Sequence, residues 1–306
     1  MSNYVSKITD KKIEVEKIIN LLIDDKYNER LANCCSSIDE YTDKSYFPTY
    51  PCKVHFCPVC TYLKIRREYA ISCQVYEKLM QLNPKPVLYF ATLTIEECQG
   101  DKVTEAVKLI KDSFNRLIRI KRVKNVLRGS SLFIHFGMNK TMVTPHAHVV
   151  MALKPSFSGK QYINVNELQE LWKSALQVSY YPHVKLNRIG EAGPENIENN
   201  KQDFAASSTY GINSITFDDI KDNSRVFNQI VDEVKGLRKV THNSLIKELR
   251  KEVADDYAAT KIQKVKVVSN KLNYKNKSYQ IRSNSLLNQD YEIEIINPLE
   301  NKLNLV

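Results

Sequence analysis

The sequence predicts an α+β protein with an antiparallel central sheet and helices packed on it. Apolar, β-rich runs of strand length alternate along the chain with longer stretches of helical periodicity. Two of the strand-like runs are separated only by a short turn, which is typical of an antiparallel hairpin. With 306 residues, 42% of them hydrophobic, the chain can form one large domain or two ordinary ones around a real core.

The first part of the chain predicts a helix followed by a cysteine-rich module. Residues 1–30 alternate charged residues with Ile, Val and Leu, as an amphipathic helix does, and lack the apolar core of a signal peptide. Residues 31–62 hold five cysteines and three prolines, which predicts a loop-rich segment. Residues 63–83 form a basic helical stretch that ends before two prolines. We therefore expect a module at 1–83.

The middle of the chain predicts the sheet. The expected elements are strands at 87–94, 130–136, 142–153 and 183–189, helices at 104–127, 166–178 and 202–212, and a loop at 190–201. This order matches a ferredoxin-like or related antiparallel sheet with helices on one face. Residues 217–250 are expected to be mostly helical. We therefore expect a second domain at 84–253 and a polar C-terminal extension at 254–306.

A net charge of +10 favours a polyanionic partner, most simply nucleic acid. The alternative is a mildly basic solvated surface. No apolar stretch approaches the length of a membrane span, so a cytoplasmic location is expected. The candidate DNA-binding residues lie in two basic segments and are Lys64, Arg66, Arg67, Arg116, Arg119, Lys121 and Arg122.

Cysteine spacing predicts a structural zinc site. Either Cys34 or Cys35 can join Cys52, Cys57 and Cys60, with 17, 4 and 2 residues between the successive ligands when Cys34 is the first. Four thiolates close a tetrahedral zinc site, and a cytosolic chain keeps its thiols reduced. A redox pair at Cys57 and Cys60, or simply buried thiols, are the alternatives.

Two histidines in a strand-like run predict a catalytic metal site. His146 and His148 are two residues apart, so on a strand their side chains point to the same face. The expected hairpin places His135 on the neighbouring strand, where it can complete a three-histidine site for a divalent ion. An exposed pair, or a core pair with satisfied hydrogen bonds, is the alternative.

These features resemble the rolling-circle replication initiators of small bacterial plasmids, which are single-tyrosine members of the HUH endonuclease superfamily. The resemblance covers roughly residues 30–253 and implies that the second domain is an HUH nicking and joining domain with trailing helices. The similar blocks, in chain order, are residues 30–34, 52–60 with 66–67, 90–94, 145–148, 172–176, Tyr210, and 236–239 with 245–248.

The resemblance implies a catalytic chemistry. Mg²⁺ or Mn²⁺ on the histidines polarises the scissile phosphate, and Tyr210 attacks it to give a 5′-phosphotyrosine and a free 3′-OH. The other candidate nucleophiles are Tyr162, Tyr180 and Tyr181. The family has a glutamate one helical turn before its tyrosine, and this position is Ala206 here. Asp203, two turns before Tyr210, is the candidate replacement as a base.

The implied partners are single-stranded or hairpin origin DNA, a host helicase and a host polymerase, and a homodimer is considered. Two other functions are kept as alternatives. One is a zinc-containing DNA-binding protein without catalysis, which the missing glutamate favours. The other is an HUH transposase or relaxase, to which the cysteine block is less similar.

Overall fold

The computed structural model describes residues 3–23, 25–41, 46–48, 50–190, 197–210, 212, 215, 217–259, 262–273, 278–284 and 293–296. The chain forms two compact units. The first contains residues 1–70, 216–224 and 254–306, and the second contains residues 71–215 and 225–253. This arrangement differs from the three consecutive segments expected at 1–83, 84–253 and 254–306, because segments from both ends of the chain belong to one unit.

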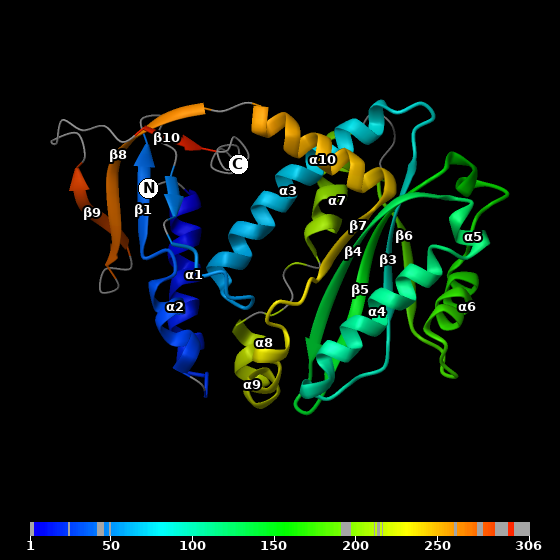
Figure 1. Ribbon diagram of the computed structural model, residues 1–306, viewed down its shortest axis with the longest axis horizontal. Helices are drawn as coiled ribbons and strands as arrows, with labels where there is room; N and C mark the ends of the chain where they lie inside the picture. Colours follow the sequence, from blue (N-terminus) through cyan, green and yellow to red (C-terminus); the bar gives the residue numbers. More distant parts are fainter. Residues whose placement is uncertain are drawn as a thin grey trace. The chain divides into compact units, whose positions relative to one another are not determined.

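A five-stranded antiparallel sheet forms the centre of the second unit (Figure 1). Its strand order is β6-β3-β5-β4-β7. The strands are β3 (Val87–Thr94), β4 (Leu127–Met138), β5 (Val143–Leu153), β6 (Val184–Arg188) and β7 (Val240–Asn243). The expected α+β fold with an antiparallel central sheet and packed helices is confirmed. The prediction that residues 217–250 are mostly helical missed β7, which pairs with β4.

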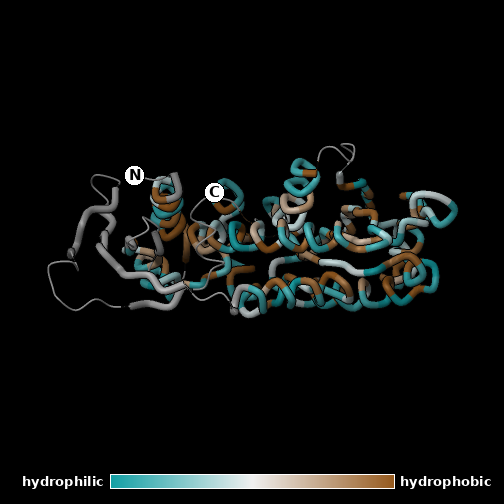
Figure 2. The backbone as a smooth tube through the Cα atoms, turned by 90° about the horizontal axis from the view of Figure 1, so that it is seen from above, coloured by the Kyte–Doolittle hydropathy of each residue, from teal (hydrophilic) through white to brown (hydrophobic). Residues whose placement is uncertain are grey.

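Helices cover both faces of this sheet, so the expectation of helices on one face was wrong. Ala147 and Val150 point to opposite faces of β5, and both are fully buried. In Figure 1, α4 (Val103–Leu117) crosses in front of the strands, while α7 (Ile197–Tyr210) lies behind them. Figure 2 shows hydrophobic and hydrophilic residues alternating along the helical parts of the backbone. The other helical elements of this unit are η2 (Gly100–Lys102), α5 (Lys121–Lys124), η3 (Pro155–Ser158) and α6 (Val165–Leu176), together with most of α9 (Ser224–Glu233) and α10 (Ser244–Ala259), whose first residue and last six residues, respectively, belong to the first unit.

The periodicity of α4 explains why it packs on the sheet. Val103, Val107, Ile110, Phe114 and Leu117 recur at intervals of three or four residues, and all five are buried. On the adjacent α6, the indole Nε1 of the buried tryptophan at 172 donates a 2.8 Å hydrogen bond to the carbonyl at the end of β3. The polar handle of this large ring therefore fixes the helix against the strand end.

A tight turn sets the register of the β4–β5 hairpin. The side-chain oxygen of Asn139 accepts hydrogen bonds from the backbone N–H groups of Thr141, at 3.0 Å, and Met142, at 2.7 Å. The backbone of Asn139 also donates to the carbonyl of Met142 at 3.0 Å. Such local bonds are what an Asn at a turn supplies. The turn places His135 directly opposite His146.

The first unit contains a second sheet, in the order β10-β8-β1-β2, with β9 paired to β8. The pairing of β1 with β8 joins residues near the two ends of the chain. Among the described helices, none combines the length and the hydropathy of a membrane span. The elements are α1 (Asn3–Ile19), η1 (Asp25–Tyr27), α2 (Asn28–Asn33), β1 (Ser37–Tyr41), β2 (Tyr46–Pro48), α8 (Phe217–Asp222), β8 (Ile262–Asn273), β9 (Ser278–Asn284) and β10 (Ile293–Ile296), while α3 (Pro58–Gln81) begins in this unit and ends in the second.

Partial burial of His242 on β7 predicts acid sensitivity. Desolvation, with smaller contributions from Arg250 and Arg238, lowers the pKa of His242 from 6.5 to about 3. Between these values the unfolded chain binds a proton that the folded chain excludes, so stability falls as pH drops from 6.5 towards 3. We expect His242→Gln to reduce this loss by at most about 1.4 kcal/mol per pH unit. Urea unfolding between pH 4 and 7.5 measures it.

The matched control replaces the exposed His183 with Gln. This variant should keep the pH dependence of the parent protein. An unchanged slope in His242→Gln would show that this half-buried imidazole is not a source of the acid sensitivity.

Candidate functional site

Three histidines meet at the turn end of the central sheet. His146 and His148 lie on the same face of β5, and His135 lies opposite His146 on β4. The Nδ1 atom of His135 is 3.0 Å from Nε2 of His146. Each imidazole offers a nitrogen within 4.8 Å of those of the other two. The structure therefore brings together the three residues that the sequence proposed.

Hydrogen bonds outside this cluster orient two of the rings. Nδ1 of His148 lies 3.2 Å from the hydroxyl of Thr92 on β3, and Nδ1 of His146 lies 3.0 Å from the carbonyl oxygen of Thr144. The ring of His148 also stacks on that of Phe90, with a centroid separation of 5.3 Å. Such supporting contacts fix which nitrogen of a histidine can face a metal ion.

The electrostatics of the cluster favour neutral imidazoles. Desolvation, helped by the neighbouring His146 and His135, lowers the pKa of His148 to about 3. Desolvation also lowers the pKa of His146. The Nε2 atom of His148 is buried and has no hydrogen-bond partner among the described residues. An unpaired buried nitrogen is costly, and a cation at this position would satisfy it.

The cluster fits a divalent metal ion. Two nitrogens bound at right angles about 2.1 Å from one ion lie about 3 Å apart, close to the observed separation of His135 and His146. Three protein ligands leave coordination positions open for a substrate, as catalytic sites require. The donor set is therefore suited to polarising a phosphate oxygen.

Tyr210, at the end of α7, lies against this cluster. Its ring centroid is 4.9 Å from that of His148 and 6.5 Å from that of His135, and its ring meets Phe90 edge-on at 6.3 Å. The side chain is 63% exposed, so the phenol remains open to a large substrate. The other candidate tyrosines make different contacts: Tyr180 with Glu96, Tyr181 with Lys173, and Tyr162 with Phe157.

The candidate base Asp203 is not part of the histidine cluster. Asp203 lies on α7 seven residues before Tyr210 and is exposed. Ala206, one turn before Tyr210, is also exposed, so this position can accommodate a longer side chain. The geometry thus places the phenol of Tyr210 beside the histidines, without an adjacent carboxylate on the same turn of α7.

Four cysteines form a second cluster in the first unit. Sγ of Cys34 lies 3.5 Å from that of Cys57 and 3.6 Å from that of Cys60, and the Cys52–Cys60 separation is 3.7 Å. These distances exceed a disulfide bond. Sulfurs bound tetrahedrally about 2.3 Å from zinc lie about 3.8 Å apart, so the cluster fits such an ion. Between the two first-ligand candidates, Cys34 and not Cys35 belongs to the four-sulfur group.

A charged residue that no sequence pattern indicated lies beside this cluster. Lys12 on α1 is fully buried, and its ammonium donates to the carbonyls of Leu31, at 3.0 Å, and Ala32, at 2.5 Å. Burial lowers the pKa of Lys12, while the nearby cysteines, Cys34 first among them, raise it. A buried cation beside sulfur ligands offsets the negative charge of thiolates. Amphipathic spacing alone places Lys12 on a helix without indicating its burial.

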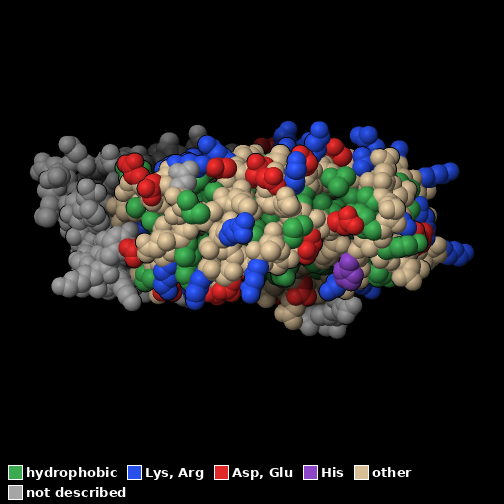
Figure 3. All heavy atoms as spheres, turned by 90° about the horizontal axis from the view of Figure 1, so that it is seen from below, with side chains coloured by type: hydrophobic (Ala, Val, Ile, Leu, Met, Phe, Trp, Pro, Cys, Tyr) green, Lys and Arg blue, Asp and Glu red, His purple; other side chains and the backbone are tan. Residues whose placement is uncertain are grey.

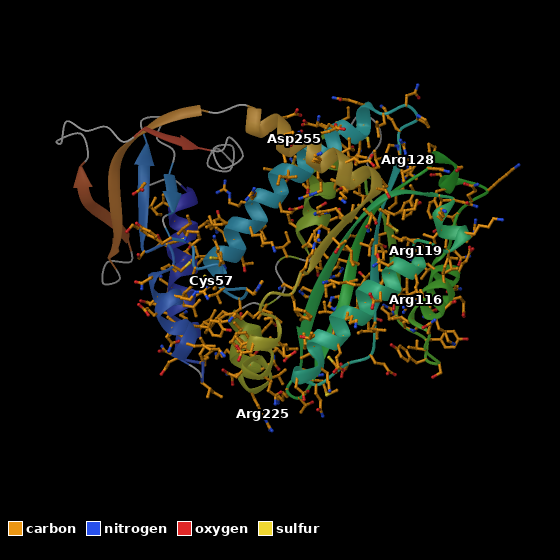
Figure 4. The ribbon with its side chains drawn as sticks, viewed as in Figure 1. Cys57, Arg116, Arg119, Arg128, Arg225 and Asp255 are labelled. Carbon is orange, nitrogen blue, oxygen red and sulfur yellow. The ribbon has the colours of Figure 1, made fainter. Side chains whose placement is uncertain are left out.

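The basic candidates divide into two groups. Arg116 on α4 donates a 2.6 Å hydrogen bond to the carbonyl of Ala175, and Arg122 on α5 forms a 2.5 Å ion pair with Glu167. Both arginines therefore make contacts that hold α6 in place. Figure 4 labels Arg116 and Arg119 near the end of α4. Figure 3 shows Lys and Arg side chains at the rim of one face, with acidic side chains interspersed. Arg66 contacts the ring and the hydroxyl of Tyr62. The exposed candidates are Lys64, Arg67, Arg119 and Lys121.

Comparisons with known proteins find replication proteins. A family model described as replication protein matches residues 44–290. A protein rep of Streptococcus pneumoniae serotype 2 is 27% identical over 210 residues, which are 67% of this chain and 64% of that relative. A protein rep of Staphylococcus aureus is 25% identical over 222 residues, 69% of this chain and 94% of that relative.

A protein rep of a Bacillus species is 26% identical over 269 residues, 78% of this chain and 86% of that relative. The chain therefore spans a little less than two thirds of the pneumococcal relative and most of the other two. No solved structure matches the chain.

Removal of one sulfur tests the cysteine cluster. We expect Cys57→Ser to lose one bound metal ion per chain and to unfold at a lower temperature, because an ion on the four sulfurs would join the segment after α2 to the start of α3, and three sulfurs would hold it less tightly. Elemental analysis and thermal unfolding with and without a chelator measure both effects. Cys73→Ser, which changes a half-buried cysteine outside the cluster, is the control. Full metal content in Cys57→Ser would contradict the assignment.

Proposed function

We propose that this chain, which belongs to the replication protein family, initiates rolling-circle replication of a plasmid by nicking one strand of origin DNA. The observation that carries this proposal is the position of Tyr210, whose exposed ring lies 4.9 Å from the ring of His148 in a three-histidine cluster. A nucleophile, a set of metal ligands and an opening to solvent are the parts that such a reaction needs.

The chemistry follows from the placement of these side chains. The phenol oxygen of Tyr210 attacks the scissile phosphorus, and the bond from phosphorus to the 3′-oxygen breaks. The products are a 5′-phosphotyrosine and a free 3′-OH, to which the phenol proton is passed through solvent. The covalent link conserves the phosphodiester for later joining. Contacts with His148 and Phe90 hold the phenol ring beside the histidines before DNA arrives.

The histidine cluster would hold the catalytic ion. A divalent cation on His135, His146 and His148 would stabilise the charge that develops on the phosphate oxygens. Three imidazole nitrogens suit a transition metal better than Mg²⁺, which prefers oxygen ligands. Of the two ions that the resemblance implies, Mn²⁺ therefore fits this donor set better. Thr92 and Thr144 keep the imidazoles aimed at a common point.

The cysteine cluster would hold a structural Zn²⁺. Cys34, Cys52, Cys57 and Cys60 supply the closed four-sulfur set that such sites use. Lys12 would offset part of the negative charge of this set. No open coordination position remains for a substrate, so this centre would stabilise the first unit and leave catalysis to the histidines.

Origin DNA, single-stranded or extruded as a hairpin, is the proposed substrate. The exposed Lys64, Arg67, Arg119 and Lys121 would contact phosphates, which gives affinity without sequence selection. Arg66, Arg116 and Arg122 have intramolecular partners and would contribute less. The free 3′-OH would prime a host polymerase while a host helicase separates the strands. The reaction on plasmid DNA would take place in the cytoplasm. A homodimer would supply a second nucleophile for joining.

Covalent capture of DNA tests the nucleophile. We expect labelled single-stranded origin DNA and Mn²⁺ to give an adduct that survives denaturing electrophoresis, and Tyr210→Phe to reduce it at least about 10³-fold because the attacking oxygen is absent. His148→Ala should reduce adduct formation as well.

Tyr162→Phe provides the matched control. Tyr162 is 44% exposed, and it follows the end of β5 that is remote from the turn. It should form the adduct normally. Tight DNA binding without any adduct under Mg²⁺ or Mn²⁺ would instead identify a zinc-containing DNA-binding protein without catalysis. The absence of a glutamate at Ala206 is the feature that favours this second candidate.

Substitutions on α7 test how the adduct is released. We expect Ala206→Glu to accelerate hydrolysis of the phosphotyrosine, because a carboxylate one turn from Tyr210 can activate water. If Asp203 serves as the base in its place, Asp203→Asn should slow hydrolysis by roughly 10²-fold without changing nicking. The decay of purified adduct measures both rates. An adduct that decays equally in all three proteins would exclude both roles.

A further inference from the structure

We propose that the loop between α6 and β6 carries a stacking platform for unpaired bases next to the histidine cluster. The platform consists of Tyr181 and Lys173, and Lys185 on β6 extends it towards the histidines. The proposal rests on the proposed nicking function for the identity of the bound strand. It assigns these residues a role in positioning DNA and removes Tyr181 from the candidate nucleophiles.

The side chain of Tyr181 is unusually open for an aromatic residue. It is 64% exposed, and Nζ of Lys173 lies 3.4 Å from the centroid of its ring. This cation–π contact holds the ring in place and adds positive charge beside it. Proteins that bind single strands combine such rings with basic groups, because every base has a face that can stack.

Three hydrogen bonds hold the loop against the end of β3. The carbonyl of His183 accepts hydrogen bonds from the backbone N–H of Thr94, at 3.1 Å, and from its hydroxyl, at 2.9 Å. The hydroxyl of Tyr180 accepts a hydrogen bond from the backbone N–H of Glu96 at 3.2 Å. Tyr181 lies between these two anchored residues. Its ring is therefore held in position before a ligand binds, which lowers the cost of ordering it.

The same strand pairing connects the loop to the histidines. Thr94 lies opposite His146, so the path from His146 through Thr94 and His183 to Tyr181 is at most roughly 17 Å between Cα atoms. An extended single strand covers this distance in a few nucleotides. The platform would therefore hold a base near the phosphate that Tyr210 attacks, at a fixed offset from it.

Lys185 lies on β6 at the level of His148, four residues after Tyr181. It pairs with Thr92 on β3, which in turn pairs with His148 on β5, so all three side chains point to one face of the sheet. Two strand spacings separate Lys185 from His148, about 10 Å between Cα atoms. Lys185 is exposed and has no ion-pair partner among the described residues. It is therefore placed to contact a phosphate of a strand that leads to the histidines.

Equilibrium binding of DNA tests the platform without any chemistry. The parent protein carries Tyr210→Phe and is kept free of divalent ions that reach the histidines. The probe is a fluorescein-labelled oligothymidylate of about 20 nucleotides, long enough for one such track. We expect Tyr181→Ala to weaken binding roughly 5- to 150-fold and Tyr181→Phe to bind like the parent, because the ring is what stacks. Lys185→Ala should weaken binding and reduce the salt slope by about 0.7.

A spectroscopic signal separates stacking from an indirect effect. Trp172, the one tryptophan of the chain, is fully buried, so the indole of a Tyr181→Trp variant reports on the platform. Its fluorescence should be quenched by the single strand and not by the matching duplex. Quenching that is equal for both would overturn the stacking role, since a duplex does not expose the faces of its bases.

Matched variants at the other end of β5 serve as controls. Tyr162→Ala and Lys160→Ala remove an exposed tyrosine and an exposed lysine, and both should bind the probe like the parent. The proposal is overturned if Tyr181→Ala binds as tightly as the parent, or if the controls weaken binding equally. The adduct assay on the wild-type chain is a separate measurement, so loss of nicking and loss of the platform are distinguished.

Discussion

The register of the β4–β5 hairpin is the constraint on which the candidate active site depends. Opposite pairing places His135 beside His146, and the two-residue repeat of a strand returns His148 to the same face. A slip of one residue would turn β5 over and send His146 and His148 to the opposite face, where Ala147 and Val149 are buried. Asn139 in the turn and the pairing of β3 with β5 both act against that slip.

The fold and the histidine cluster were accessible from the sequence because both depend on local patterns. Alternation in residues 142–153 predicted a strand, and a short turn before it predicted the neighbour that carries His135. The expected family was confirmed by the match over residues 44–290. Tyr210 was predicted as the candidate nucleophile through its position in a family pattern, since nothing in its local sequence separates it from the other 16 of the 17 tyrosines.

The features that the sequence did not predict depend on contacts between distant residues. Strand β7 is four residues long and is stabilised by β4, so no local periodicity marks it. The sequence shows that Arg116 and Arg122 are charged, but it does not show that Arg116 donates a hydrogen bond to the carbonyl of Ala175 or that Arg122 forms an ion pair with Glu167. Likewise, Cys34 and Cys35 are adjacent, so their spacings to Cys52 differ by only one residue and do not show which of them joins the cluster. The folded structure shows that Cys34 does.

The first unit combines segments from both ends of the chain, and this affects the order of folding during translation. Strand β1 pairs with β8, whose first residue is synthesised more than 200 positions after the end of β1. At usual rates of elongation, β1 leaves the ribosome roughly 10 to 45 s before its partner. The sheet that carries the three histidines, complete once β7 has emerged, can therefore form first. The cell would then contain a nascent chain in which the histidine-bearing sheet is assembled and the first unit is unfinished.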